Sequence, residues 1–262
     1  MLRKNEGDEM TLYDAIFVRK SEHNFKMEAL APTYIEEVLQ FYQTVQNLFL
    51  GIETEVSIIE NLGHSKKAGH FSVKAPYYMA IYSEEVERDM MNAGYIMEQI
   101  TLFLTTKGIA SCFVETFLIK QPYRLKGTKK LLILLAFGKS KSAATRKAAD
   151  MKRLPMESLC VFKETPRQGV RQLLEAARCA PSSWNHQLWR FLVFDSRIHV
   201  FSRTAGRGAH NKYAEFSFGG MLSHIMVAAD ELWIDLDMIR LENISHRTFR
   251  KSEYVLSIVL NM

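Results

Sequence analysis

Two long segments that are apolar on nearly every side constrain the fold of this chain most. They are MMNAGYIMEQITLFLTTKG, residues 90–108, and FSFGGMLSHIMVAADELW, residues 216–233. Each has the length of a helix, and the first ends on Gly108, a residue type that favours helix termination. Because a helix that is apolar all round must be covered on every side, we expect both to lie in the core, packed against each other between two sheets.

The elements expected around these helices come in the same order twice: a helix, a strand, the core helix and a second strand. In the first half the flanking elements are residues 33–49, 75–83 and 129–138, and in the second half they are residues 169–180, 189–194 and 254–260. The spacing also agrees, since 39 residues separate Gly94 from Ile133 and 38 separate Gly220 from Ile258. This order predicts a diverged duplication with a period of about 120 residues.

The duplication predicts an α+β fold, in which layers of helix and sheet form an α/β/α sandwich with internal pseudo-twofold symmetry. The first repeat is expected at residues 10–160 and the second at residues 161–262, closely packed as the single-chain equivalent of a homodimer. A ligand site in such a molecule is expected where the repeats meet. Within the first repeat, we expect a short helix that ends at Arg19 and a longer one that is capped by Thr33 after Pro32.

Composition and charge exclude several classes of protein. The chain has 262 residues, of which 47% are hydrophobic, enough for a sizeable core. Its longest apolar run, residues 131–137, is too short to span a membrane, and the charged N-terminus has no apolar signal segment. Three widely spaced cysteines and eight histidines without ligand spacing predict neither disulfides nor a metal site. We therefore expect a cytoplasmic protein with no membrane contact.

A basic segment, KSKSAATRKAADMKR at residues 139–153, holds six basic residues and one aspartate. It could be a solvated linker, or one or two of its side chains could reach a phosphate group. It has no aromatic residue on which a base could stack, and the net charge of the whole chain is only +5. Nucleic acid is therefore not expected as a partner.

Four short segments resemble motifs of the nitroreductase family. VRKSEHNF, residues 18–25, resembles the R-x-S-x-R/K motif, and APSSWNHQLWRFLVF, residues 180–194, resembles the A-P-S-x-x-N-x-Q-P-W-x-F-x-V segment. GIASCFVE, residues 108–115, is similar to the G-x-x-S-x-x-x-E loop, and MKRLPMESL, residues 151–159, is similar to the K-x-R-x-P-L-E-E segment. The likeness covers about residues 10–260 and is greatest to the duplicated TM-type branch, in which one chain takes the place of the dimer.

The resemblance implies a nitroreductase-like fold and an FMN-dependent oxidoreductase. A hydride would pass from NAD(P)H to N5 of FMN and then to a nitroaromatic, quinone or similar small-molecule acceptor, in ping-pong order. NAD(P)H would bind transiently over the flavin, since no Gly-x-Gly-x-x-Gly dinucleotide fold is visible. The chain would be a pseudo-dimeric monomer, with further self-association left open. No side chain is expected to act as a catalytic residue.

The resemblance also assigns residues to the cofactor. The expected FMN-binding residues are Arg19, Lys20, Ser21, His23, Val114, Glu115, Arg153, Pro181, Ser182, Ser183, Asn185 and Gln187. Arg19 and Arg153 would meet the phosphate, since guanidinium groups suit that geometry. The loop at residues 181–187 would supply short donors and acceptors from the opposite half. The backbone N–H of Glu115 would face flavin N5, where charge develops on the reduced ring.

Some residues depart from the family pattern or invite another interpretation. Met151 stands where the family has a lysine, so that only the neighbouring Lys152 could substitute, and Leu188 stands where the family has a proline. Cys112 has no identifiable histidine partner, so we expect it to pack in the core rather than to act as a nucleophile. Trp189 is likewise expected in the core.

Two other functions stay open. An FMN-binding storage or sensor protein with little turnover would carry the same site, under a lid at residues 201–216, whose glycines and basic residues predict a mobile loop. A hydrolase would use Ser182 or Ser183 with His186, but the segment lacks a Gly-x-Ser-x-Gly elbow and an evident acid. Because the Asn/Gln loop occurs only in the second half and the R-x-S motif only in the first, we expect one FMN per chain.

Overall fold

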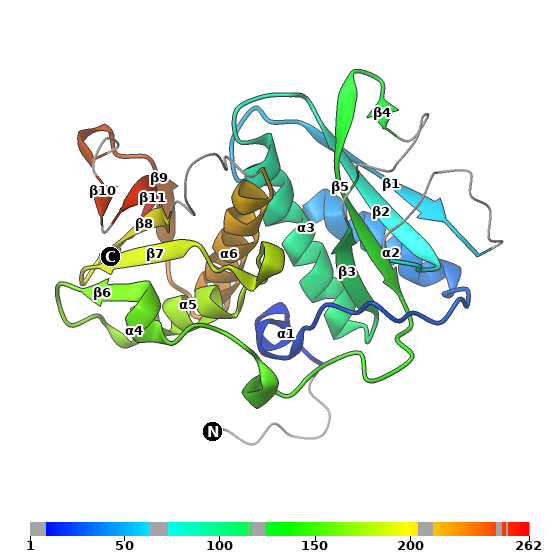
Figure 1. Ribbon diagram of the computed structural model, residues 1–262, viewed down its shortest axis with the longest axis horizontal. Helices are drawn as coiled ribbons and strands as arrows, with labels where there is room; N and C mark the ends of the chain where they lie inside the picture. Colours follow the sequence, from blue (N-terminus) through cyan, green and yellow to red (C-terminus); the bar gives the residue numbers. More distant parts are fainter. Residues whose placement is uncertain are drawn as a thin grey trace. The chain divides into compact units, whose positions relative to one another are not determined.

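The computed structural model describes residues 9–62, 73–114, 116, 124–203, 212–244, 248–249 and 251–261. The chain divides into two compact units, Met1–Asp150 and Met151–Met262. This boundary comes before the predicted repeat boundary at residue 160, since residues 156–162 form a short helix and a strand of the second unit. Each unit contains one sheet and one long core helix (Figure 1).

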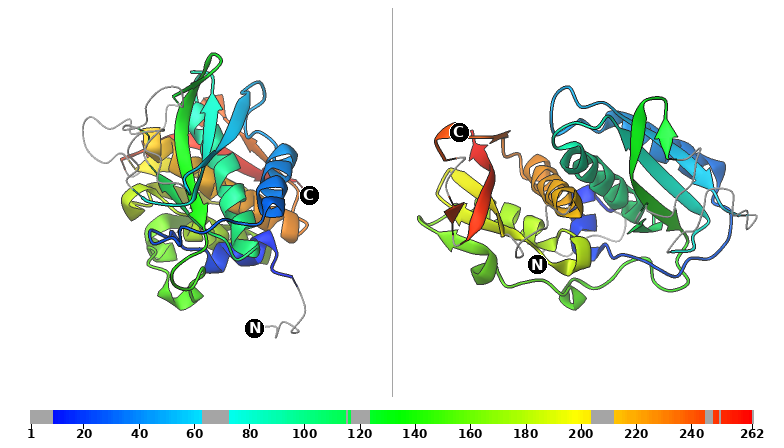
Figure 2. Two further views of the ribbon diagram at one scale, coloured as in Figure 1. Left: turned by 90° about the vertical axis from the view of Figure 1, so that its right-hand side faces the viewer. Right: turned by 45° about the horizontal axis from the view of Figure 1, so that its top comes forward.

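The first unit has an antiparallel sheet with the strand order β1-β2-β5-β3, and β4 pairs with β5. Its elements are α1 (Leu12–Val18), α2 (Pro32–Thr44), β1 (Thr54–Glu60), β2 (Tyr77–Ser83), α3 (Asp89–Thr106), β3 (Ala110–Val114), β4 (Leu125–Lys126), β5 (Lys129–Gly138) and the 3-10 helix η2 (Ala148–Asp150). Helix α3 lies along one face of this sheet (Figures 1 and 2). The predicted core helix and the strands β2 and β5 are confirmed.

Both faces of the central strand β2 are covered, so all seven of its residues are buried. Helix α3 lies on one face. On the other face, Tyr78 and Tyr82 pack in an apolar cluster that includes Phe25, from the segment after α1. The Tyr78 hydroxyl donates to the carbonyl of Val73 at 2.7 Å and accepts from the N–H of Ala75 at 3.0 Å, so its polar atom is satisfied in the core. Burial on both faces explains why this strand shows no polar alternation.

The first helix begins with a capping box. Thr11 Oγ1 accepts the N–H of Asp14 at 3.1 Å, and Asp14 Oδ2 accepts the N–H of Thr11 at 3.0 Å. The prediction that Thr33 caps the second helix is wrong, because α2 begins one residue earlier at Pro32. The fixed φ of proline and its missing N–H suit the first turn of a helix.

Helix α2 ends at Thr44, short of the predicted end at residue 49. The side chain of Asn92, in the first turn of α3, explains the early end. Its Oδ1 accepts the N–H of Leu48 at 2.8 Å, and its Nδ2 donates to Asn47 Oδ1 at 3.0 Å. The backbone at Leu48 and the side chain of Asn47 are thus bonded to the core helix, and α2 does not continue.

The second unit has a sheet with the strand order β10-β11-β8-β7-β6, and β9 pairs with β11. Its elements are α4 (Met156–Leu159), β6 (Cys160–Phe162), α5 (Gln168–Cys179), the 3-10 helix η3 (Ser183–Asn185), β7 (Trp189–Val193), β8 (Arg197–Arg203), α6 (Lys212–Glu231), β9 (Leu236–Ile239), the 3-10 helix η4 (Glu242–Ile244), β10 (Thr248–Phe249) and β11 (Ser252–Leu260). Strand β6 runs parallel to β7, and the other pairs are antiparallel. The predicted helix α5, core helix α6 and strands β7 and β11 are confirmed.

The two units share one strand topology. The order β1-β2-β5-β3 in the first unit corresponds to β7-β8-β11-β9 in the second, and the short strands β4 and β10 pair with corresponding strands. This order corrects the strand alignment drawn from the sequence, because the counterpart of β7 is β1 rather than β2. The counterpart of β2 is β8, which the sequence pattern did not reveal. Two diverged repeats would produce such a match, although a common origin of the units stays a prediction.

Among the described residues, no helix is long and apolar enough to cross a membrane.

The two core helices end in the same way. After α3, the N–H of Ile109 donates to the carbonyl of Leu104 at 2.9 Å, and Gly108 has a φ of 69°. After α6, the N–H of Ile234 donates to the carbonyl of Ala229 at 2.9 Å, and Trp233 has a φ of 55°. Both are Schellman-type ends, in which glycine is the usual left-handed residue.

Candidate functional site

Arg19, the first residue of the R-x-S motif, is held in the core of the first unit. It directly follows α1, and its Nε lies 3.2 Å from Oε1 of Glu98 in α3; the two side chains are 4% and 0% exposed. A buried guanidinium requires such a partner, because an unpaired buried charge is strongly destabilising. The ion pair therefore fixes Arg19 against the core helix, and its contact with a phosphate stays a prediction.

Glu22 organises the segment that carries the predicted site residues. Its Oε1 accepts the backbone N–H groups of the next two residues, each at 2.9 Å. Its Oε2 accepts the hydroxyl of Ser140 and lies 3.2 Å from Nζ of Lys20. Burial alone would raise the pKa of Glu22, but these hydrogen bonds and the charge of Lys20 hold it at about 2. The carboxylate is thus ionised at neutral pH and fixes the segment after Arg19.

Ser21 and His23 have exposed side chains beside β3, which is the edge strand of the first sheet. Ser21 forms a parallel β-bridge with Ser111, and the N–H of Glu22 donates to the carbonyl of Ser111 at 3.0 Å. The motif segment therefore covers this sheet edge with backbone hydrogen bonds. Its two exposed side chains stay accessible to a ligand.

Cys112 in β3 has a histidine neighbour, contrary to the expectation from the sequence. Nδ1 of His23 lies 3.7 Å from its sulfur atom. The thiol is buried, and burial raises its pKa to about 11, although the charge of Arg19 acts in the opposite direction. Because the thiolate is the nucleophilic form, a thiol with this pKa is unreactive at neutral pH. Cys112 is therefore a packing residue.

The predicted flavin loop follows the same strand. Val114, the last residue of β3, is buried in the cluster that contains Cys112. Glu115 lies outside the described residues. The predicted N5 contact of its backbone N–H stays a prediction.

The basic segment at residues 139–153 is attached to the first unit over much of its length. The carbonyl of Lys139 accepts the N–H of Lys26 at 2.9 Å, and the N–H of Arg146 donates to the carbonyl of Val18 at 2.8 Å. Thr145 also forms an antiparallel β-bridge with Arg19. The segment is therefore not a free linker, and it lies alongside the R-x-S motif.

Arg153, at the start of the second unit, joins the closing basic segment to the Ser/Asn/Gln loop. Its Nε and Nη2 donate to the carbonyl of Cys179 at 3.3 and 3.0 Å, at the C-terminal end of α5, where a positive charge is favourable. Its Nη1 donates to Asn185 Oδ1 at 3.0 Å, and Asn185 Nδ2 donates to the carbonyl of Lys152 at 3.1 Å. Two predicted site residues thus belong to one hydrogen-bonded cluster.

Gln187 holds the loop in place from inside. It is 2% exposed, and its Oε1 accepts the N–H of Leu154 at 2.8 Å while its Nε2 donates to the carbonyl of Asn185 at 3.0 Å. Its own N–H donates to Ser182 Oγ at 2.9 Å. Both ends of the Gln187 amide are therefore used within the protein, which makes it a positioning residue for the loop.

The serines of the loop are anchored to α6. The N–H of Ser183 donates to Ser217 Oγ at 3.1 Å, and Ser217 Oγ donates to the carbonyl of Tyr213 at 2.7 Å. Pro181, Ser182 and Ser183 are half-buried. In the part of the chain that the structure describes, the Ser183 hydroxyl has no hydrogen bond of its own. This hydroxyl is therefore available to a ligand.

The backbone of the loop is strained. Trp184, Asn185 and Gln187 have φ values of 53°, 56° and 48°, a region that asparagine visits but that tryptophan and glutamine rarely adopt. Each such residue costs on the order of 1–3 kcal/mol, and strain of this kind gathers at functional sites. Trp184 is also 81% exposed, so its own burial does not offset the cost. The contacts of Arg153 and Gln187 hold the loop in this conformation.

A packed wall lies behind the loop. Trp189 is fully buried and meets Phe218 edge to face at 6.2 Å between ring centroids, which confirms that it belongs to the core. A cavity of about 10 Å³ beside it, lined in part by Ser182 and Ser217, has room for about one water molecule. The loop therefore packs against the core and does not cover an open cavity.

The structure bears on two of the alternatives. The ring of His186 makes no hydrogen bond to a loop serine or to a carboxylate within the described residues, so the hydrolase arrangement is not found there. Of the predicted lid at residues 201–216, residues 201–203 belong to β8 and residues 212–216 to α6, whereas 204–211 lie outside the described residues.

Sequence reasoning missed three residues that hold these segments: Glu22, Glu98 and Ser217. Glu98 carries a usable signal, since a lone carboxylate in the middle of an apolar helix predicts a buried cationic partner. Glu22 and Ser217 carry none, because a glutamate in a polar segment and a serine near a helix start are ordinary surface residues in most proteins.

The two sheets, each with its core helix, and the motif segments around them define an α+β protein with the nitroreductase fold. A family model described as "Putative TM nitroreductase" matches residues 11–229, and the chain belongs to this family. No curated protein matches the sequence.

Several solved structures are similar to this chain. A protein from Thermotoga maritima, described as a "putative nitroreductase", aligns with 99% of this chain and 98% of its own, at 18% identity and a TM-score of 0.64. A nitroreductase family protein from Clostridium difficile 630 aligns with 56% of this chain and 94% of its own, at 13% identity and a TM-score of 0.44. An FMN-dependent nitroreductase from Clostridium difficile R20291 aligns with 53% and 93%, at 15% identity and a TM-score of 0.42. The first of these likenesses shows the shared fold.

Proposed function

We propose that this protein is an FMN-dependent oxidoreductase of the nitroreductase type, which takes a hydride from NAD(P)H and reduces a nitroaromatic, quinone or similar small-molecule acceptor. Family membership supports the reaction class. The observation that carries the proposal is the loop at residues 181–187, which is strained and yet fixed by Arg153 and Gln187. Backbone strain maintained by such contacts is expected at a binding site.

The donor groups of this chain fit the chemistry of FMN. A terminal phosphate requires cationic partners, and Lys20 and Arg153 lie on the two predicted site segments. A hydroxylated ribityl chain requires neutral donors and acceptors, which the hydroxyls of Ser21, Ser182 and Ser183 can supply. We propose that one FMN binds per chain.

The residues of the second unit would act by preorganisation. Arg153 and Asn185 fix each other, and Gln187 ties the loop to the backbone of the closing segment. The loop would therefore already have its binding conformation before the cofactor binds. Because the loop would then lose little conformational entropy on binding, the affinity for the cofactor would be higher. When bound, FMN supplies the hydride chemistry, and the protein's part is to position the ring and exclude other reactions. No side chain is assigned as a proton donor.

The proposal is tested by the flavin content and the turnover of the purified protein. We expect released FMN and steady-state oxidation of NADH or NADPH when a quinone or nitroarene is present. Arg153→Gln should lower flavin occupancy, whereas the matched control Arg178→Gln, which removes an arginine paired with Glu175 on α5, should leave it unchanged. Bound FMN without turnover would favour a storage or sensor protein instead. Protein that neither contains nor takes up flavin would contradict the proposal.

A further inference from the structure

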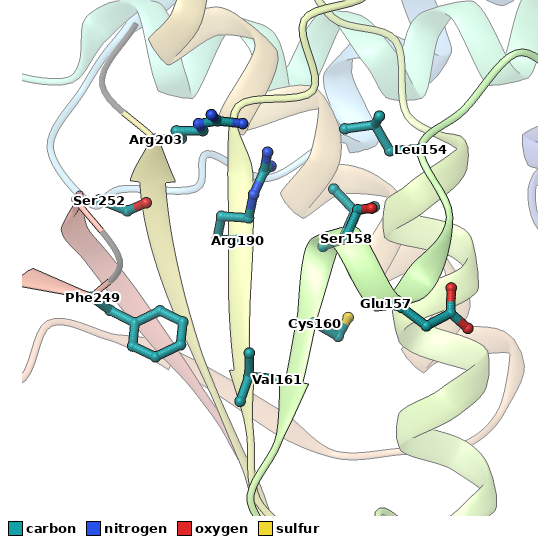
Figure 3. Close-up of a pocket in the computed structure, with 10 residues that line it drawn as sticks. Leu154, Glu157, Ser158, Cys160, Val161, Arg190, Arg203, Phe249 and Ser252 are labelled. Atoms are coloured by element: carbon teal, nitrogen blue, oxygen red, sulfur yellow. The ribbon is translucent and has the colours of Figure 1, made fainter. Parts of the chain in front are cut away.

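The second unit contains a pocket that the proposed flavin function does not use. Its cavity of about 410 Å³ lies within the size range of small-molecule sites. The lining residues are Leu154, Glu157, Ser158, Leu159, Cys160, Val161, Arg190, Arg203, Phe249 and Ser252. In β7, Arg190 lies between Trp189 and Phe191, which are fully buried. Because side chains alternate along a strand, the side chain of Arg190 lies on the opposite face of the sheet from these core residues. Figure 3 shows this side chain in the pocket.

Two arginines bring positive charge to one end of this pocket. Figure 3 shows the guanidinium groups of Arg190 and Arg203 close together, whereas the carboxylate of Glu157 lies on the other side of the pocket. Burial lowers the pKa of Arg190, and the charge of Arg203 lowers it further, as expected for two neighbouring cations. Nη1 of Arg190 donates only to backbone carbonyls, at 2.9 and 2.6 Å. Within the described residues neither arginine has an ion pair.

A buried hydroxyl completes the positive end of the pocket. Ser252, at the start of β11, is 1% exposed, and its Oγ has no hydrogen-bond partner among the described residues. Figure 3 shows this oxygen on the side of Ser252 that faces the arginines. An unsatisfied buried hydroxyl costs about 1–3 kcal/mol. The guanidinium groups of the half-buried Arg190 and the exposed Arg203 and the unsatisfied hydroxyl of Ser252 thus lie at the same end of the pocket (Figure 3), a donor set that suits an oxyanion.

The rest of the pocket wall is largely apolar. Leu154, Val161 and Phe249 line it. The wall therefore suits the uncharged body of a ligand whose anionic group lies at the arginine end.

We propose that this pocket binds a small organic anion, whose carboxylate or phosphate group lies between Arg190 and Arg203 and accepts a hydrogen bond from Ser252. The apolar part of the ligand lies against Val161 and Phe249. This site is separate from the flavin function, and its test does not require turnover.

The test uses the full-length protein with benzoate, inorganic phosphate and the neutral benzamide as probes, at constant ionic strength. Binding is measured by calorimetry and by the shift in the thermal midpoint. We expect benzoate, phosphate or both to bind and benzamide not to bind. Binding of benzoate alone assigns the site to carboxylates, and binding of phosphate alone assigns it to phosphates.

Two variants and one matched control locate the site. Arg203→Gln should weaken binding of the anion at least about tenfold, the scale of one charge-assisted hydrogen bond, and Ser252→Ala should weaken it severalfold. Arg197→Gln changes an arginine at the other end of β8, where it lies over Phe194, and should leave affinity unchanged. The proposal is overturned if neither anion binds, if benzamide binds equally well, or if Arg203→Gln has no more effect than Arg197→Gln.

Discussion

Replacing Arg19 with alanine should destabilise the protein and weaken its flavin binding, for two separable reasons. The first is the ion pair with Glu98, whose partners are 4% and 0% exposed and 3.2 Å apart. Removal of one partner from a buried pair costs about 3–5 kcal/mol, because the remaining charge stays buried without that partner. With a urea m-value of about 3 kcal/mol per molar, the unfolding midpoint should fall by about 1 M or more.

The second reason is the predicted contact of the guanidinium with FMN. Loss of a charge-assisted contact would weaken FMN binding by about 2–3 kcal/mol. Glu98→Gln separates the two effects, because it breaks the ion pair but leaves the guanidinium in place. This variant should lose stability while it keeps most of its flavin affinity. A double substitution, Arg19→Met with Glu98→Leu, should recover most of the stability, since apolar replacements of a buried pair are often neutral.

The assay is urea unfolding of the flavin-free protein, followed by circular dichroism, together with flavin titration of the folded protein. Two results would refute the reasoning. A loss of less than about 1 kcal/mol in Arg19→Ala would mean that the pair is not buried as described. Equal loss of flavin affinity in Arg19→Ala and Glu98→Gln would mean that the arginine acts only through the stability of the fold.

Three further predictions follow from single residues. The pKa of Glu22 is lowered from 4.5 to about 2. Its contribution to the free energy of unfolding, about 3 kcal/mol, is therefore fully present above pH 5 and is lost between about pH 5 and pH 2. Acid unfolding of Glu22→Gln should show a weaker pH dependence over that range, and an unchanged acid transition would contradict this. Cys112→Ala should leave turnover nearly unchanged, since the thiol stays protonated; loss of turnover with flavin still bound would restore a nucleophilic role. Trp233→Gly should stabilise the protein by about 0.5–1 kcal/mol in thermal unfolding, because Trp233 is 96% exposed and its backbone is in the left-handed region. Gly108→Ala, at the matching position after α3, should destabilise the protein by about 1 kcal/mol. A destabilised Trp233→Gly would show that the indole makes contacts that outweigh the backbone strain.

The core could be predicted from the sequence because burial leaves a clear pattern. Helix α3 and strand β5 are continuous apolar segments, and the structure buries most of their residues. The strand β1 was missed because it is mostly half-buried and its seven residues mix charged and apolar types. The strand β8 leaves a weak signal because it begins and ends in arginine, and its last three residues, 201–203, fall in the loop predicted from the glycines that follow.

The site could be predicted only in part, because side-chain partners far apart in the sequence leave no local signal. The loop at residues 181–187 was found from its unusual concentration of polar residues. Its attachment to Arg153 and Ser217 depends on tertiary contacts across more than thirty residues. Similarly, the sequence placed Arg19 at a helix end but gave no reason to pair it with Glu98.

We predict one flavin per chain, because the first unit lacks a counterpart of the serine-containing loop. The counterpart of the loop between α5 and β7 is the segment between α2 and β1, residues 45–53, which contains no serine. The side-chain amide of Asn47 in this segment bonds to that of Asn92 in α3, which also accepts the N–H of Leu48. A second flavin would therefore lack the serine partners that the loop at residues 181–187 offers, at a cost of about 1–3 kcal/mol for each unmatched polar group.

The most direct test of this account is the ratio of released flavin to protein. Purified protein, reconstituted with excess FMN and freed of unbound cofactor, should release one FMN per chain on heating, as measured by absorbance and identified by mass spectrometry. Release of FAD as the sole flavin, a ratio near two per chain, or a protein that cannot be loaded with flavin would contradict the account.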